Sequence, residues 1–128
     1  MSRVIAFAAA TFVLAAPASA QTGYFALMPD LPIAPGLSEM DASLGPMSYA
    51  DGSEMFVLHA SGAAAPEDVR HFYAESLSAL GWAFEPGEDQ ELAYLRGRER
   101  LTLRIAPLGE VTVLRATLIV EPASMNAD

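Results

Sequence analysis

The spacing of apolar residues in this 128-residue chain changes from that of a helix to that of strands at Gly81. Before Gly81, apolar side chains recur with the 3.6-residue period of one helix face, at Val69, Phe72, Tyr73, Leu77 and Leu80. Pro66 is suited to the first turn of such a helix, and Gly81 is suited to its end. The sequence therefore predicts one amphipathic helix between these two residues.

After Gly81 the pattern becomes that of strands, and at residues 101–105 apolar residues alternate with polar ones, as in a strand that buries one face. Short breaks rich in Gly and Pro separate four predicted strands, at residues 82–85, 92–96, 100–106 and 111–121. Ahead of the helix, Asp51-Gly52 predicts a tight hairpin turn between a short strand and a second strand at residues 54–60. The order ββαββββ predicts an α+β domain in which one helix packs on a curved antiparallel sheet.

We place this domain at residues 47–122. Three segments outside it differ from it in composition. Residues 1–20 resemble a signal peptide, because Arg3 precedes an apolar run that ends in Ala18-Ser19-Ala20. We therefore expect export to the periplasm, cleavage after Ala20 and no membrane insertion afterwards. Residues 21–46 contain four prolines and predict an extended, Pro-rich arm, whereas residues 123–128 predict a flexible tail.

Charge and composition limit the classes of function. Removing Arg3 with the signal peptide leaves six arginines against sixteen acidic residues, a net charge of −10, which disfavours binding to nucleic acid. The chain has no Cys and no Lys, so thiolate and Schiff-base chemistry are excluded. No Gly-x-Ser-x-Gly motif is present. We therefore assign no catalytic, cofactor-binding or metal-binding residue, and we expect a protein that is not an enzyme.

The last predicted strand is apolar on both faces, and the strand at residues 54–60 is similar. The residues that point away from the predicted helix are Val111, Val113, Ile119, Met55 and Val57. One helix covers only one face of a sheet, so we expect a further cover for these side chains, because exposing several of them is costly. Three candidates could cover this face: the arm, with its apolar Leu31 and Ile33, a second copy of the chain, or a different partner. The arm is the simplest because it is always present.

Two functions follow from these expectations. The first is a non-catalytic interaction module of the bacterial envelope, which binds an envelope protein or itself through the second sheet face or the arm. The alternative is a periplasmic protein that binds a small ligand in a pocket between helix and sheet, floored by Trp82 and Tyr94.

Several landmarks also resemble a known group of proteins. They are Leu31-Pro32, Pro35-Gly36-Leu37, Leu80-Gly81-Trp82 and Tyr94-Leu95-Arg96. Over residues 27–122 this pattern is similar to a group of small uncharacterised exported proteins of alphaproteobacteria. The resemblance implies a periplasmic location and no known activity, and it transfers no functional residue to this sequence.

Overall fold

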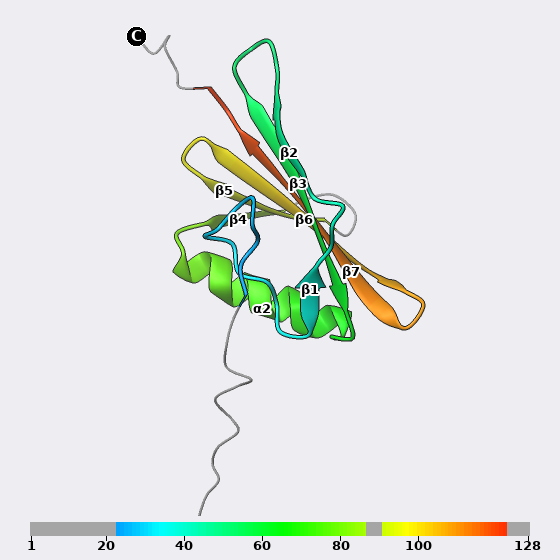
Figure 1. The fold of residues 1–128 in the computed structure, drawn as a ribbon. Helices are drawn as coiled ribbons and strands as arrows, with labels where there is room; N and C mark the ends of the chain where they lie inside the picture. Colours follow the sequence, from blue (N-terminus) through cyan, green and yellow to red (C-terminus); the bar gives the residue numbers. More distant parts are fainter. Residues whose placement is uncertain (1–22, 87–90, 123–128) are drawn as a thin grey trace, which may run out of the picture.

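The structure is a computed structural model that describes residues 23–86 and 91–122. The predicted signal peptide and the predicted tail lie outside the described residues. Within the described part, one helix accompanies a seven-stranded antiparallel sheet (Figure 1), which confirms the predicted α+β class. The elements are β1 (Leu37–Glu39), β2 (Leu44–Ser48), β3 (Glu54–Gly62), α2 (Pro66–Ala79), β4 (Ala83–Pro86), β5 (Glu91–Arg96), β6 (Glu99–Leu108) and β7 (Val111–Val120).

The helix begins and ends close to the expected residues. Pro66 occupies its first turn, and the acidic side chains of Glu67 and Asp68 lie beside the positive end of the helix dipole. Val69, Tyr73 and Leu77 are buried, so the apolar face inferred from the 3.6-residue period is the face that packs on the sheet.

The observed order, βββαββββ, has one strand more than the predicted ββαββββ, which is a correction. The additional strand is β1, which lies within the residues expected to form the arm and pairs with the end of β3. This pairing requires a close backbone approach, since a Cβ atom on Gly62 would clash with the carbonyl oxygen of Gly36. The strand is only three residues long, so alternation along it gives too little signal for detection.

The strands follow the order β1-β3-β7-β6-β5-β4, and β2 also pairs with β3. β7 is therefore central, with β3 on one side over nine register pairs and β6 on the other over ten. Each of these pairings is antiparallel. Residues directly opposite one another share a face of the sheet, so the register fixes which side chains from distant parts of the chain are neighbours.

Residues 23–36, called the N-terminal segment below, pack on the same side of the sheet as α2 (Figure 1). Phe25, Met28 and Leu31 belong to one buried cluster with the apolar face of the helix. Tyr73 fixes this arrangement, because its hydroxyl donates a hydrogen bond of 2.7 Å to the Pro32 carbonyl and accepts one of 3.0 Å from the backbone N–H of Ala34. The N-terminal segment and the helix together cover one face of the sheet.

This packing corrects one expected interaction residue. Leu31 has no exposed surface and lies in the core, so it is not available to a partner. Ile33 is partly buried against the same core. The N-terminal segment thus extends the cover on the helix side, and the opposite face of the sheet receives no cover from residues 23–36.

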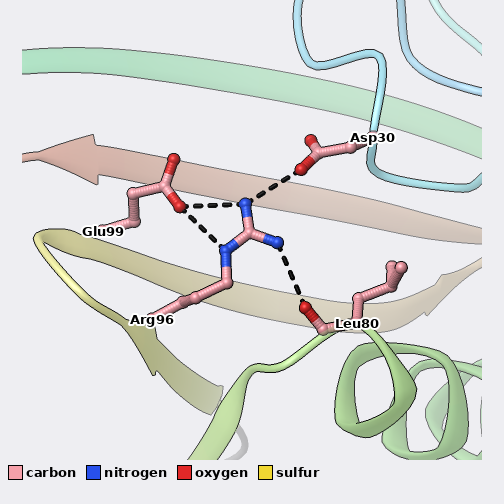
Figure 2. Close-up of polar contacts among 4 residues, drawn as sticks. All are labelled: Asp30, Leu80, Arg96 and Glu99. Carbon is pink, nitrogen blue, oxygen red and sulfur yellow. Dashed lines mark hydrogen bonds and ion pairs between the residues drawn. The ribbon is translucent and has the colours of Figure 1, made fainter.

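Arg96 on β5 ties the N-terminal segment to the sheet (Figure 2). Its guanidinium group lies 2.9 Å from a carboxylate oxygen of Asp30 and 2.9 Å from one of Glu99, and it donates a hydrogen bond of 3.3 Å to the Leu80 carbonyl. The same group stacks over the ring of Trp82, 4.3 Å from its centroid. One side chain therefore joins the N-terminal segment, the end of the helix and the β5–β6 hairpin.

Candidate functional site

The face of the sheet opposite to α2 is called the outer face below. Leu58 on β3 and Leu114 on β7 point to the helix side and have no exposed surface. Their neighbours Val57 and Val113 point the other way and remain partly exposed. Within residues 23–86 and 91–122, no helix or strand lies over this outer face.

The register brings several expected interaction residues together at one end of the outer face. Met55 on β3 lies directly opposite Ile119 on β7. On its other side Met55 pairs with Met47 of β2, and Val57 pairs with Leu44. Leu44 is 57% exposed, and the other four side chains are partly exposed. We call Leu44, Met47, Met55, Val57 and Ile119 the methionine patch.

The remaining expected residues lie toward the other end of the same face. Val113 is flanked by Ser61 of β3 and Ala106 of β6. Val111 lies opposite Leu108 at the tip of the β6–β7 hairpin, where the two side chains are 39% and 67% exposed. The outer face therefore has two apolar regions, separated along the strands.

A polar row crosses the outer face between these regions. His59 on β3 lies opposite Arg115 on β7, Arg115 lies opposite Arg104 on β6, and Arg104 lies opposite Glu91 on β5. We call His59, Arg115 and Arg104 the arginine row. Sequence reasoning did not single out Arg104 and Arg115, although both alternate with apolar residues and so point outward. Only the register across three strands reveals that they are neighbours.

The arginine row lines a shallow depression of about 220 Å³, whose other lining residues are Ala106 and Val113. Glu91 places a carboxylate oxygen 3.5 Å from the Arg104 guanidinium. The Nδ1 atom of His59 is buried and has no hydrogen-bond partner among the described residues. The depression thus presents several nitrogen groups beside a small apolar surface, and the chemistry that suits it is the binding of an anionic group.

A second depression, of about 420 Å³, lies between α2 and strands β4 and β5. Tyr94, Leu92 and Phe84 contribute its apolar surface, while Arg70 and His71 contribute polar groups. Burial raises the pKa of Tyr94, so this phenol stays neutral over the physiological range. Of the two expected pocket residues, Tyr94 lines this depression and Trp82 does not. Trp82 is only 4% exposed and lies beneath Arg96, so its place in the pocket floor is corrected.

Some other charged side chains on the surface contact each other within the fold. On α2 the Nε2 atom of His71 lies 3.3 Å from a carboxylate oxygen of Glu75, and Arg100 forms an ion pair of 2.8 Å with Glu85. In the part of the chain that the structure describes, no three His, Asp or Glu side chains gather into a possible metal site. The same part contains no helix that is long and apolar enough to cross a membrane.

Comparison with protein-family models, curated proteins and solved structures finds no match for this chain. The interpretation of the site therefore rests on its own geometry.

Proposed function

We propose that this protein is a non-catalytic interaction module of the bacterial envelope and that it binds another protein through the outer face of its sheet. The observation that carries the proposal is the two groups of partly exposed apolar side chains on strands β3 and β7, over which no described helix or strand packs. Burial of such side chains is worth about 25 cal/mol per Å² of apolar surface, so a partner that covers them gains binding energy. The periplasmic location is part of the proposal and rests on the signal-peptide pattern of residues 1–20.

The charge distribution favours a different protein over a second copy of this chain. The chain has a formal net charge of −9, yet the outer face carries Arg104 and Arg115 near its centre. In a symmetric pair formed through this face, the basic rows of the two copies would lie close together, and the two acidic bodies would repel each other. A partner that presents an acidic or apolar patch to this face and is not itself strongly acidic overall meets neither penalty. We therefore propose that the partner is a different protein.

Photo-crosslinking in intact cells tests the proposal. A photoreactive amino acid replaces Val113 or Ile119 on the outer face and, as the control, the exposed Ala79 at the end of α2. The proposal predicts an adduct of the same mass from Val113 and Ile119 and no such adduct from Ala79. An adduct at twice the mass of the chain would show that the partner is a second copy of this chain. Equal adducts from all three positions would show that the outer face does not bind selectively. Either result would overturn the proposal.

A second function, the binding of a small apolar ligand, is favoured by the depression between α2 and β5. Its volume of about 420 Å³ falls within the range of about 300 to 1,000 Å³ typical of ligand pockets. Phe84 and Leu92 would contact an apolar ligand, and Arg70 at the rim would contact its polar end. Leu92→Arg fills this depression with a charged chain, so it should abolish any thermal stabilisation by a bound ligand. Ligand-induced stabilisation that persists in this variant would exclude the pocket as the binding site.

A further inference from the structure

We propose that the arginine row is the recognition point for a carboxylate side chain of the partner, and that the partner segment carries this acidic residue between apolar neighbours. The inference rests on the proposed function, because it names the chemistry of the partner that binds the outer face. It starts from the juxtaposition of His59, Arg115 and Arg104 on three adjacent strands.

Like charges directly opposite each other in a sheet are destabilising, and Arg104 and Arg115 are such a pair. The chain contains sixteen acidic residues, yet among described side chains the carboxylate recorded in contact with this row is Glu91, at 3.5 Å from Arg104. His59 adds a third nitrogen-bearing side chain on the far side of Arg115. A carboxylate placed over Arg115 would offset the repulsion in the row, so the row is arranged to accept an anion.

The unpaired Nδ1 of His59 is an independent observation. Buried polar atoms almost always have a hydrogen-bond partner, and this atom has none among the described residues. His59 also lines the same depression as the two arginines. A carboxylate bound in the depression would bring a hydrogen-bond acceptor to this imidazole, for the tautomer in which Nδ1 carries the proton.

The size of the depression distinguishes a side chain from a free ligand. Its volume of about 220 Å³ is smaller than the roughly 300 Å³ at which small-molecule pockets begin. Val113 and Ala106 give it an apolar wall, which suits the methylene stem of an Asp or Glu side chain. The carboxylate itself would meet the guanidinium groups, which bind it in a two-pronged geometry.

The neighbours of the row indicate what should flank the acidic residue. On one side of the row lies the methionine patch, and on the other lie Val113 and the exposed Leu108. A partner segment that follows the strand direction would therefore place apolar side chains before and after its carboxylate. The acidic body of the protein disfavours a phosphate-rich membrane or nucleic acid as the source of the anion, so we assign a protein segment.

The probe is the peptide acetyl-Leu-Glu-Leu-amide, with acetyl-Leu-Gln-Leu-amide as its uncharged match. Binding is followed by NMR, through the imidazole resonances of His59 and the backbone amides of β7. Arg115→Gln removes the central guanidinium, and Arg98→Gln makes the same change of charge at the β5–β6 turn, outside the depression. Both variants alter exposed residues, so both are expected to fold.

We expect saturable shifts at His59 with the glutamate peptide, and roughly tenfold weaker binding with the glutamine peptide or in Arg115→Gln, since a charge-assisted hydrogen bond is lost. Arg98→Gln should bind within about twofold of the natural protein, because surface charges at a distance are screened. Equal weakening in both variants, or no saturable shift up to the solubility limit of the peptide, would overturn the inference.

These results separate the inference from the proposed function. If crosslinks from Val113 form in cells and persist unchanged in Arg115→Gln, the outer face binds a protein without the carboxylate, and only the inference fails. If the glutamate peptide binds at His59 but Val113 gives no selective adduct in cells, the anion site stands and the proposed function fails.

Discussion

The hydroxyl of Tyr73 should contribute a large share of the stability of this protein, because it joins the N-terminal segment to the helix. The substitution Tyr73→Phe removes only this oxygen and leaves the buried ring in place. It orphans the carbonyl of Pro32 and the backbone N–H of Ala34, which are bonded at 2.7 and 3.0 Å in a buried environment. Each orphaned buried group costs about 1 to 3 kcal/mol, so we expect a loss of about 2 to 4 kcal/mol once some water enters.

Urea denaturation measures this loss, with the fluorescence of Trp82, the sole tryptophan and a buried one, as the signal. The control is Tyr94→Phe, a buried tyrosine on β5 that does not contact the N-terminal segment through a hydrogen bond. Hydrogen exchange should also increase at residues 23–36 in Tyr73→Phe. A loss under about 0.5 kcal/mol, or one equal to that of the control, would refute the role assigned to this hydroxyl, because a single neutral hydrogen bond already contributes about that much.

Three further predictions concern the same fold. Arg96→Gln should lower the free energy of unfolding by roughly 1 to 2 kcal/mol in urea, because it breaks ion pairs that are only partly exposed and a contact with an aromatic ring. Gly62→Ala should destabilise the protein by about 1 to 3 kcal/mol in thermal denaturation, since its Cβ would meet the Gly36 carbonyl. Burial raises the pKa of Tyr73 and, less strongly, that of Tyr94. The folded protein therefore retains protons that the unfolded chain releases near pH 10, so the melting temperature should be unaffected by these groups below about pH 9 and fall as the pH rises above about 10.

Each of these predictions has a matched control. Arg98→Gln should cost less than Arg96→Gln, because the Arg98 side chain bonds only the Glu121 carbonyl in the described part of the chain. Gly23→Ala should be tolerated, since the nearest atom to its Cβ would lie at 3.6 Å. Tyr73→Phe should show a smaller loss of stability above pH 10 than the natural protein. Equal effects in a variant and its control would contradict the structural explanation in that case.

The elements that sequence reasoning found best are those with a long, regular period. The helix from Pro66 and the strand that forms β6 each carry enough turns or alternations to identify their buried face. The N-terminal segment has no such period. Phe25 and Leu31 are buried in a segment whose Pro32 and Ala34 backbone groups bond the Tyr73 hydroxyl, about forty residues later in the chain, and no local pattern predicts a contact of that range.

Part of the candidate site could also be predicted from the sequence, and part could not. Met55 and Ile119 were found because both belong to strands that are apolar on both faces, and the register places them directly opposite each other. The arginine row was missed because its members come from three strands and meet only when the register is known. A shift of one residue in either pairing would have put Arg104 or Arg115 on the buried face. The outward position of each was visible in the sequence, but their proximity was not.

The central claim is that the outer face is occupied in the cell. Because the chain contains no Cys, single-cysteine variants at Val113 and at the exposed Ala79 can be labelled with a maleimide without background. The measurement compares the labelling rate of each variant in intact cells with its rate in the purified protein. We predict that the cysteine at position 113 is protected in cells relative to the purified protein, whereas the cysteine at position 79 is labelled at similar rates in both. Equal rates in cells and in the purified protein at position 113 would contradict the account.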